Sequence, residues 1–497
     1  MNRVLQLLYG LLCAVCIPFL AGAQGVNPYL QAVTPYSIVV NWKTNVAVSP
    51  QVRMGLSPTS LDMLIGGSTQ LMNDVNYNND YHYHTVKLHG LQPATKYYYR
   101  VLSGGDSSAL LSFHTLPQAG AAPNASNHLR FLILGDNQIK AEPRYDSLMT
   151  AARRKMTQLY GANFNDSVSF ILNLGDQVDV GTLDHYENVH LNKSKYLSGL
   201  LPIQTAVGNH ETYGTLKMQA YYNHFYLDSM QYKGIYSGSE EYYAFQAGNT
   251  VIIYLNTESS AANSTQFNWA KRVIDSVNND ASVKWFITIG HRPYQAEQYV
   301  GDISTWMRNT VVPYALQSPK YFMNVGAHHH LYARGQMENQ PAYNIISGGT
   351  AWNQYWGMAT EQNFDDVQKT ISNWAYQLVD IDMATDKATV VTYSIGSIYN
   401  TKDNVVIDSF YRSKQLAVPV TPQVTNNFPD SLQLPVTITG SAFASTAGEQ
   451  LNSTEFQVAP DRNFGVVEKK SYRHYEDLFG MVTGATADTT KDQNLGL

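Results

Sequence analysis

Between residues 130 and 349, short apolar runs alternate with amphipathic stretches, and this alternation restricts the fold more than any other feature of the chain. The runs are RFLILG (130–135), SFILNLG (169–175), TVIIYLN (250–256), KWFITIG (284–290), YFMNVGA (321–327) and YNIISGG (343–349). Helical periodicity appears between them, at 145–160, 265–279 and 302–316. Continuous apolar strands that alternate with helices predict an α/β core whose strands are buried on both faces.

The preceding segment, residues 24–118, has the alternation of half-buried β-strands. In YSIVVNWK (36–43), Ile38, Val40 and Trp42 fall on one face and the intervening residues fall on the other. The stretch LHGLQPATKYYYRVL (88–102) resembles a fibronectin type III strand, with Tyr97 at the position of the tyrosine corner. An all-β, fibronectin III-like sandwich is therefore predicted in front of the α/β domain.

The limits of these domains follow from composition. Residues 1–23 have a positive start, an apolar run and small residues at the end, which predicts a secretory signal peptide cleaved after Ala23; a retained membrane anchor is the alternative. Residues 119–128 are rich in Ala and Asn and predict a linker to the α/β domain, 129–400. The remainder, 401–497, predicts a polar tail with part of a second β-sandwich.

Charge and cysteine content exclude some functions and indicate a compartment. The 497-residue chain has a formal net charge of -6 and no long basic run, which argues against a nucleic-acid-binding face. Both cysteines, Cys13 and Cys16, lie in the predicted signal peptide, so no disulfide is expected in the mature protein. No later segment is apolar for long enough to span a membrane. We expect a secreted or periplasmic protein, and the sequence leaves its oligomeric state open.

Five polar clusters stand at or near the ends of predicted strands. They are GDNQ (135–138), GDQVD (175–179), GNHE (208–211), GHRPY (290–294) and AHHHLYAR (327–334). Ligands of α/β sheets bind beyond the carboxyl ends of the strands. Each cluster supplies Asp, Asn or His, which are donors for divalent first-row metals, and none supplies a thiolate. One such cluster is usually structural, but five in series predict a metal site.

These clusters, in this order, resemble the signature of the calcineurin-like metallophosphoesterase superfamily, and in particular the purple acid phosphatases and their bacterial relatives, over about residues 26–400. The resemblance implies two divalent or mixed-valence ions of the Fe, Zn or Mn class. It implies that one ion is held by Asp136, Asp176 and His330, and the other by Asp176, Asn209, His291 and His328, with Asp176 bridging. It also implies that His210 donates to the phosphoryl oxygens or the leaving group, and we expect Glu211 to orient His210.

Three positions depart from the family pattern. Gln138 stands where the superfamily usually has His, and its amide oxygen, a weaker donor than imidazole, either ligates the first metal or leaves it less tightly held. Asp179 replaces the tyrosine ligand of the purple acid phosphatases, so the colour that comes from an iron–tyrosinate bond is not expected. Ala327 replaces a glycine, and we expect the backbone there to suit alanine.

The three consecutive histidines, 328–330, require an assignment of their own. Because alternate residues of an extended chain point the same way, His328 and His330 are predicted to face the metals together and His329 to face away. The candidates for substrate contact are Arg292, Tyr294, Tyr332 and Arg334. Trp352, Tyr355 and Trp356 are candidates either for stacking on a substrate or for the core.

The sequence thus supports two classes of function. The first is a secreted, acid-phosphatase-like phosphohydrolase that releases phosphate from small phosphomonoesters by attack of metal-bound hydroxide. A phosphodiesterase or nucleotide hydrolase with the same metal centre remains open, because the ligands do not separate monoesters from diesters. The second class is a non-catalytic surface-binding protein, which would be marked by the loss of Asp176, Asn209 or His291; all three are present.

Overall fold

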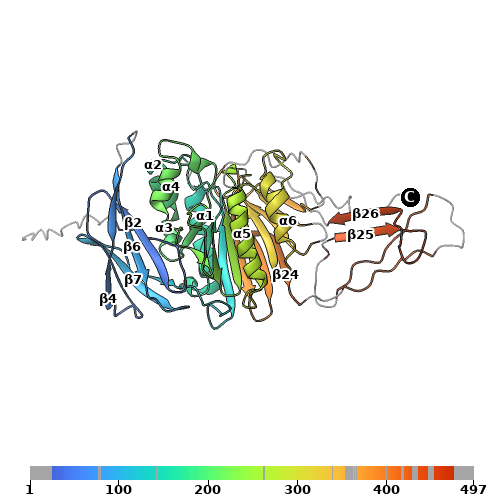
Figure 1. The fold of residues 1–497 in the computed structure, drawn as a ribbon, viewed down its shortest axis with the longest axis horizontal. Coiled ribbons are helices and arrows are strands. Elements are labelled where there is room, and N and C mark those ends of the chain that lie inside the picture. The colour runs from blue at the N-terminus through green and yellow to red at the C-terminus, as the bar shows by residue number, and fades with distance from the viewer. Residues whose placement is uncertain are drawn as a thin grey trace, which may run out of the picture.

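The computed structural model of the chain describes residues 25–75, 80–141, 144–260, 263–337, 340–352, 362, 364, 366–398, 400–415, 419–427, 435–445, 451 and 453–474. The predicted signal peptide, 1–23, and residues 475–497 of the predicted tail lie outside the described residues. Figure 1 shows a β-sandwich, an α/β body beside it and a small hairpin at the far end.

The N-terminal domain is an all-β sandwich of two antiparallel sheets. One sheet has the order β1 (Tyr29–Gln31), β2 (Ser37–Thr44), β6 (Tyr81–His89) and β5 (Ser68–Met72). The other has the order β4 (Met63–Gly66), β3 (Pro50–Gly55), β7 (Lys96–Ser103) and β8 (Asp106–Ser107), and β9 (Leu111–His114) also pairs with β7. The backbone N–H of Gln92 donates to the hydroxyl of Tyr97 at 2.9 Å, which is the contact expected of a tyrosine corner.

Strand β2 is buried on both faces, which differs from the half-buried strand predicted from its alternation. Ile38, Val40 and Trp42 lie in the core as expected. Asn41, on the opposite face, is also fully buried, and its side chain accepts a hydrogen bond from Gln31 at 2.7 Å. Gln31 in turn donates to the backbone oxygen of His224 at 2.9 Å. The α/β domain therefore covers the face that alternation alone assigns to solvent.

The second domain is built on two sheets. The first has the order β12 (Ile203–Thr205), β11 (Phe170–Asn173), β10 (His128–Leu134), β22 (Trp374–Asp382), β23 (Lys387–Ser397) and β24 (Asn400–Ser413). The second has the order β15 (Tyr243–Ala247), β16 (Thr250–Leu255), β17 (Trp285–Gly290), β18 (Tyr321–Gly326), β20 (Tyr343–Ser347), β19 (Tyr332–Gln336) and β21 (Lys369–Ile371). Strands 10–11–12 and 16–17–18–20 run parallel within their sheets.

The two sheets pack face to face with helices on their outer sides. Phe131 of the first sheet and Ile287 of the second belong to one buried core. Tyr254, also of the second sheet, donates its hydroxyl proton to the backbone oxygen of Gln204 in the first at 3.0 Å. Helix α1 (Arg144–Tyr160) contacts β22 and β24, and helix α5 (Asn263–Asn278) contacts β16 (Figure 1). This arrangement confirms the predicted α/β sandwich with strands buried on both faces.

Shorter elements complete the domain. Leu183–His185 (α2), a π-helical turn at Tyr186–Leu191 and Asn192–Ser198 (α3) form one continuous segment. The others are a 3-10 turn at Phe164–Asp166, a second at His210–Thr212, α4 (Met218–His224), the two-residue strands β13 (Gln231–Tyr232) and β14 (Ile235–Tyr236), a π-helical turn at Met307–Val311 and α6 (Val312–Ala315). The last two lie within the predicted helical stretch 302–316.

The α/β domain continues beyond the limit of residue 400 expected from the sequence. Strand β24 pairs with β23 as far as Ser413, and the guanidinium of Arg412 is buried and donates to the backbone oxygen of Pro319 at 2.9 Å. The start of β24 is polar and lacks the apolar alternation of a strand, so the sequence did not predict this strand. In the tail, β25 (Ser453–Val458) and β26 (Lys469–His474) form a two-stranded hairpin, and Val424 makes an isolated bridge with Gly440.

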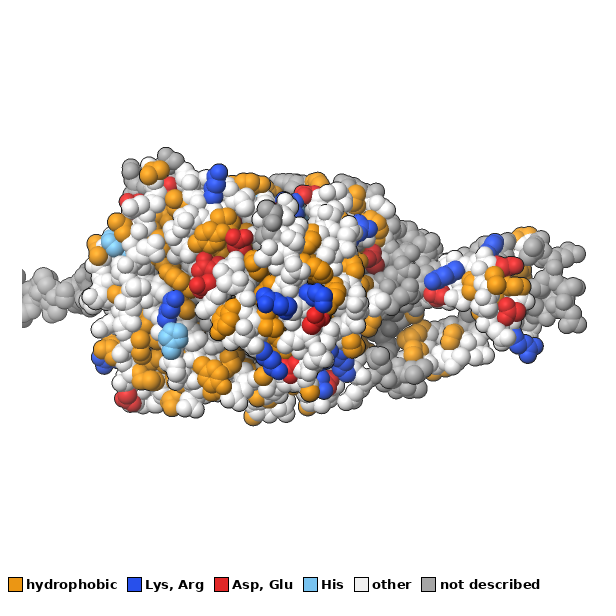
Figure 2. Space-filling view, in the orientation of Figure 1, with side chains coloured by type: hydrophobic (Ala, Val, Ile, Leu, Met, Phe, Trp, Pro, Cys, Tyr) orange, Lys and Arg blue, Asp and Glu red, His pale blue; other side chains and the backbone are white. Residues whose placement is uncertain are grey.

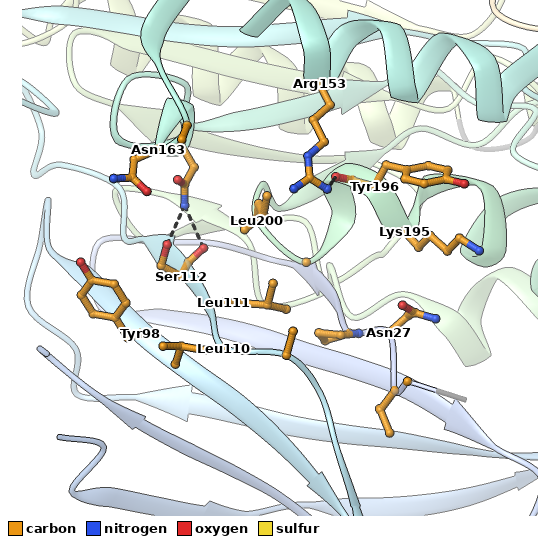
Figure 3. Close-up of a pocket in the computed structure, with 17 residues that line it drawn as sticks. Asn27, Tyr98, Leu110, Leu111, Ser112, Arg153, Asn163, Lys195, Tyr196 and Leu200 are labelled. Carbon is orange, nitrogen blue, oxygen red and sulfur yellow. Dashed lines mark hydrogen bonds between the residues drawn. The ribbon is translucent and has the colours of Figure 1, made fainter. Parts of the chain in front are cut away.

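A cavity of about 390 Å³ lies between the two domains (Figure 3). Tyr98 and Leu111 line it from the sandwich, and Arg153 and Lys195 line it from the α/β domain. Asn165 bridges the domains beside it by donating to the backbone oxygen of Ser112 at 2.9 Å and to its hydroxyl at 3.0 Å. No predicted metal ligand or substrate contact lines this cavity.

The face shown in Figure 2 carries its Lys, Arg, Asp and Glu side chains scattered among hydrophobic and other polar groups. Among the described residues, no helix combines the length and apolar character needed to cross a bilayer.

Candidate metal centre

The predicted ligands lie on loops that follow strands of both sheets. Asp136 and Asp176 follow β10 and β11 of the first sheet, and Asn209 follows β12. His291 and His328 follow β17 and β18 of the second sheet. Because parallel strands of each sheet end at one edge and the two sheets are packed together, loops from distant parts of the sequence meet at this edge.

The backbone bends sharply at three of these positions. Asp136, Asp176 and His328 adopt left-handed conformations, with φ of 58°, 51° and 68°. Such conformations are uncommon in non-glycine residues and concentrate at functional sites. Ala327 is not among the residues with positive φ, so the left-handed turn falls one residue later, at His328. Gly208 leaves room for the Asp176 carboxylate, since a Cβ at this position would lie 2.2 Å from its Oδ1.

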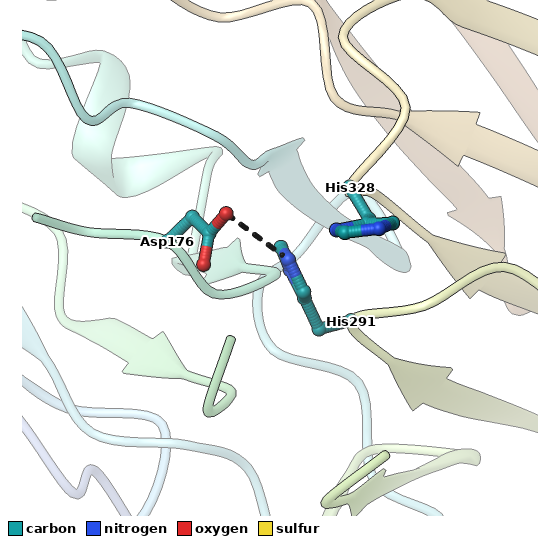
Figure 4. Close-up of side chains that lie close together, drawn as sticks. All are labelled: Asp176, His291 and His328. Atoms are coloured by element: carbon teal, nitrogen blue, oxygen red, sulfur yellow. Dashed lines mark ion pairs between the residues drawn. The ribbon is translucent and has the colours of Figure 1, made fainter. Parts of the chain in front are cut away.

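His291 presents a lone pair to two other acceptors. Its Nδ1 lies 2.9 Å from the backbone oxygen of Leu174, and a proton on Nδ1 would make this hydrogen bond and leave Nε2 as an acceptor. Nε2 lies 3.2 Å from Asp176 Oδ2 (Figure 4). It also lies 3.2 Å from Asn209 Oδ1. Three acceptor atoms that face one another repel unless a cation or a proton lies between them. This group therefore has the donor chemistry of a metal site.

A second group of side chains also contacts Asp176 Oδ2. Nε2 of His330 lies 3.6 Å from Asp136 Oδ1, and the Gln138 amide nitrogen lies 3.3 Å from the same His330 atom and 3.2 Å from Asp176 Oδ2. Within the described part of the chain, Asp136 Oδ1 and Gln138 Oε1 are buried without a hydrogen-bond partner. Buried acceptors without a partner are costly, and a bound cation would satisfy them.

The spacing of these atoms suits divalent cations. Two ligand atoms about 2.1 Å from one ion are separated by roughly 3.0–3.5 Å, and the distances above begin at 3.2 Å. Asp136, Asp176 and His330, with Gln138 beside them, would hold one ion, and Asp176, Asn209, His291 and His328 the other. Asp176 contacts members of both groups, as a bridging carboxylate must. The residues present therefore fit two cations.

The pKa values of Asp136 and His291 are raised in the metal-free cluster, which shows that the cluster favours bound protons. Burial raises the pKa of Asp136 well above its usual range; His291 opposes this shift and Asp176 adds to it. Burial also acts to raise the pKa of Asp176, but His291 and His210 reverse the shift and hold the pKa below its usual value. Burial would lower the pKa of His291, yet Asp176 and Asp136 raise it to about 10. In the absence of metal, a proton on His291 takes the position that a cation would occupy.

His210 is oriented by Asp179, which corrects the expectation that Glu211 orients it. Nδ1 of His210 lies 2.7 Å from the backbone oxygen of Asp179 and 3.4 Å from its Oδ1. Nε2 then faces the cluster, 3.9 Å from Asp176 Oδ2. Burial opposes the charged form, but the Asp179 hydrogen bond and the Asp176 charge raise the pKa of His210 to about 9. The GDQVD pattern already contained Asp179, so this partner was visible in the sequence.

Glu211 holds the ligand loops rather than His210. Its carboxylate is fully buried and accepts hydrogen bonds from the backbone N–H groups of Asp176 at 3.0 Å, Gln177 at 2.8 Å and Gly208 at 2.6 Å. Burial, together with the Asp176 charge, raises the pKa of Glu211 to about 7. Glu211 therefore ties the loop after β11 to the loop after β12.

The three histidines 328–330 do not lie on an extended strand. Strand β18 ends at Gly326, and the backbone N–H of His329 donates to Ala327 within a tight turn. His328 and His330 nevertheless both reach the cluster, because the left-handed turn at His328 redirects the chain. Nε2 of His329 lies 3.0 Å from the backbone oxygen of Asp302. The strand-alternation argument for these residues was wrong, although its predicted facing directions agree with these contacts.

Arg292 and Tyr294 have protein partners. The Nε of Arg292 donates to Glu258 at 2.9 Å, and its Nη1 pairs with Asp302. Nη1 also lies 3.0 Å from His328 Nε2, so Arg292 borders the cluster. The Tyr294 hydroxyl donates to Asp366 at 3.3 Å, and its ring packs against the core between α5 and the second sheet.

Tyr332 and Arg334 have structural roles, which differ from the expected substrate contact. The guanidinium of Arg334 makes a two-point ion pair with Asp408 of β24, at 2.9 and 3.1 Å, and the Tyr332 hydroxyl donates to the same carboxylate at 2.7 Å. This buried network joins β19 to β24. The sequence concealed it because Asp408 lies in a segment that we expected to be outside the domain.

The aromatic candidates are only partly described. The ring of Trp352 lies 5.0 Å from that of His330, which places it at the edge of the cluster. Tyr355 and Trp356 lie outside the described residues. Sequence reasoning missed Asp302 and Glu258, which contact Arg292. Asp302 stands in no polar cluster at a strand end, whereas Glu258 lies in NTESS (256–260) directly after β16, a signal that could have marked it.

Two face-to-face sheets with outer helices, and Asp, Asn and His side chains gathered at their strand ends, define the metallophosphoesterase class. Residues 129–332 match the family model of the calcineurin-like phosphoesterases, and residues 23–115 match that of the purple acid phosphatase N-terminal domain. The chain therefore carries a calcineurin-like phosphoesterase domain behind a purple acid phosphatase N-terminal domain.

Individual relatives agree with this assignment. A purple acid phosphatase from Glycine max is 23% identical over 325 residues, which are 63% of this chain; the chain spans 65% of the length of that relative. The structure is similar to that of the purple acid phosphatase PPD1 from yellow lupin (Lupinus luteus) seeds, with a TM-score of 0.63 and 18% identity over 78% of this chain and 74% of that one. It is also similar to PhoD, with a TM-score of 0.56 and 13% identity over 78% of this chain and 90% of that one.

Proposed function

We propose that this protein is a dinuclear-metal phosphohydrolase that releases phosphate from small phosphomonoesters. The observation that carries the proposal is the convergence of Asp176 Oδ2 and Asn209 Oδ1 on His291 Nε2, each at 3.2 Å, a set of donor atoms that a cation would satisfy. The match of residues 129–332 to the calcineurin-like phosphoesterases supports the reaction class.

The metal pair, when bound, would neutralise phosphoryl charge and lower the pKa of water to yield a nucleophile near neutral pH. The protein supplies the remaining parts of the reaction. His210 presents Nε2 to the cluster, and Asp179 holds its ring from the other side, so His210 can give a proton to the leaving oxygen. Glu211 fixes the loops that carry Asp176 and Asn209, which keeps the spacing of the ligands.

Metal analysis combined with turnover tests this function. The purified protein should contain up to two metal ions per chain and hydrolyse p-nitrophenyl phosphate; chelation should stop turnover and metal should restore it. Faster turnover of bis-p-nitrophenyl phosphate than of the monoester would assign the protein as a diesterase with the same centre. Absence of both metal and turnover, with a folded protein, would support the non-catalytic binding protein.

We also propose that the protein is secreted or periplasmic, because the sequence of residues 1–23 has the pattern of a cleaved signal peptide. Amino-terminal sequencing of the protein recovered from its native source checks this, and an intact Met1 terminus would contradict it.

A further inference from the structure

Asp302 contacts two of the three consecutive histidines, although no sequence pattern marked it. It lies on the loop between β17 and the π-helical turn at Met307–Val311. Its Oδ2 is 2.8 Å from Nε2 of His328, and its backbone oxygen is 3.0 Å from Nε2 of His329. Its Oδ1 pairs with Arg292. The backbone oxygen and both carboxylate oxygens of Asp302 therefore contact residues in or beside the metal-ligand cluster.

The contact with Asp302 determines which nitrogen of His328 is available to a metal. An ionised carboxylate can only accept hydrogen bonds, so the 2.8 Å contact requires a proton on Nε2 of His328. A neutral imidazole with its proton on Nε2 has its lone pair on Nδ1. The backbone N–H of His328 donates to Asp136 Oδ2 at 2.8 Å, and a ring nitrogen of His328 lies within 4.8 Å of ligand atoms of Asp176 and His291. With Nε2 bonded to Asp302, Nδ1 is the nitrogen left for a metal.

Arg292 competes for Nε2 of His328. Its Nη1 lies 3.0 Å from that nitrogen, and because a guanidinium can only donate, a hydrogen bond between them would need the lone pair on Nε2. Nη1 also pairs with Asp302, whose carboxylate is an acceptor that the guanidinium and an imidazole N–H can share. Glu258 accepts from Nε of Arg292 at 2.9 Å and fixes the guanidinium from its other side.

We propose that Asp302 is a positioning residue for the metal centre, whose carboxylate fixes the tautomer and ring orientation of His328 so that Nδ1 faces the metal shared with Asp176, Asn209 and His291. Ligating histidines commonly donate their second ring nitrogen to a carboxylate or a backbone oxygen in this way. The backbone oxygen of Leu174 holds His291 by the same kind of contact. The inference rests on the proposed function, because it requires a metal at this site.

The proposal also gives His329 a role. Its ring holds the backbone oxygen of Asp302, so it fixes the loop that carries the carboxylate. His328 and His330 would then ligate metal. His329 would hold Asp302, which orients His328.

The test measures metal binding rather than turnover. Metal-free full-length protein is titrated with Co²⁺, whose visible absorption reports the ligand geometry, for wild type, Asp302→Ala and Asp302→Asn. Asp403→Ala is the matched control, because Asp403 is also an exposed carboxylate paired with an arginine; the exposed fractions of the two side chains are 55% and 70%. Thermal unfolding of each metal-free variant shows whether the fold is intact.

Wild type should bind two equivalents. In Asp302→Ala one of them should bind about 10–100-fold more weakly with an altered Co²⁺ spectrum. Asp302→Asn keeps a hydrogen-bond acceptor without the charge, so its metal affinity should lie between those of wild type and Asp302→Ala. Asp403→Ala should bind metal as wild type does. Two sites of unchanged affinity and spectrum in a folded Asp302→Ala would overturn the role of Asp302 alone. Failure of wild type to bind two equivalents would instead remove the proposed function. If Asp302→Ala does not fold, Asp302→Asn decides by the same criteria.

Discussion

Asp176 Oδ2 and His291 Nε2 lie 3.2 Å apart, although the two residues follow strands of different sheets. Asp176 follows β11 and His291 follows β17. Their side chains point toward each other (Figure 4). A cation bound by both would join the two sheets at this edge, so the metal centre should contribute to stability as well as to chemistry.

Replacing Asp176 by Asn should abolish turnover and leave the fold intact. Asn lacks the negative charge with which Asp176 would bridge two cations. We therefore expect a loss of activity of more than about 100-fold, which exceeds the loss typical for residues that only hydrogen-bond to a metal ligand. Turnover of p-nitrophenyl phosphate and circular dichroism check this. Wild-type turnover in the variant would remove Asp176 from the bridge.

His210 and Asp179 should act as a pair. We expect His210→Gln to lower kcat by about 10²–10⁴-fold with a smaller effect on KM, because proton donation is needed mainly in the transition state. Asp179→Asn should lower kcat less, since the backbone oxygen of Asp179 still accepts from His210 Nδ1. Steady-state kinetics of both single variants and the double variant test the pairing. Additive effects in the double variant would show that the two residues act independently.

The stability of the metal-free protein should fall as the pH rises from 7.5 to 9. The pKa of His210 is raised from 6.5 to about 9, so its contribution is complete below 6.5 and is lost as the pH rises through 9. His291, with a pKa of about 10, has the same sign. Each group adds a slope of at most about 1.4 kcal/mol per pH unit. Urea unfolding at the two pH values measures it.

Asp179→Asn supplies the control for this pH dependence, because the Asp179 hydrogen bond raises the pKa of His210. The slope should become shallower in this variant and should not vanish, since His291 remains. An unchanged slope would show that the Asp179 carboxylate does not raise the pKa of His210.

Arg334→Gln should destabilise the protein without a specific effect on substrate binding. Removing one partner of a buried ion pair costs about 3–5 kcal/mol, and Arg334 is the two-point partner of buried Asp408. Chemical denaturation measures the loss of stability, and KM at a temperature where the variant is folded tests the role in binding. A large rise in KM with normal stability would restore Arg334 as a substrate contact.

Gln138→His should tighten binding of the first metal. The amide oxygen of Gln138 is a weaker donor than imidazole, and it lies buried beside His330 without a hydrogen-bond partner among the described residues. Competition with a chromogenic chelator should show tighter Zn²⁺ binding in the variant. Gln138→Ala is the comparison: if it binds metal as wild type does, Gln138 is not a ligand.

Most of the architecture could be predicted because the apolar runs of the α/β domain are long and uninterrupted. The residues from Phe131 to Leu134 are all fully buried, as a strand covered on both faces requires. The prediction of burial was wrong for residues that are buried by a partner distant in the sequence. Asn41 is buried by the neighbouring domain, and Asp408 is buried by Arg334.

The sequence by itself determined the kinds of metal donors and the strand ends that carry them, because strand periodicity and residue chemistry are local properties. The tertiary structure decided the partners. It assigned Asp179 to His210, three backbone amides to Glu211 and Asp302 to His328. These contacts depend on where two packed sheets bring their loops, and the path of a loop is set by the elements that flank it rather than by its own residues.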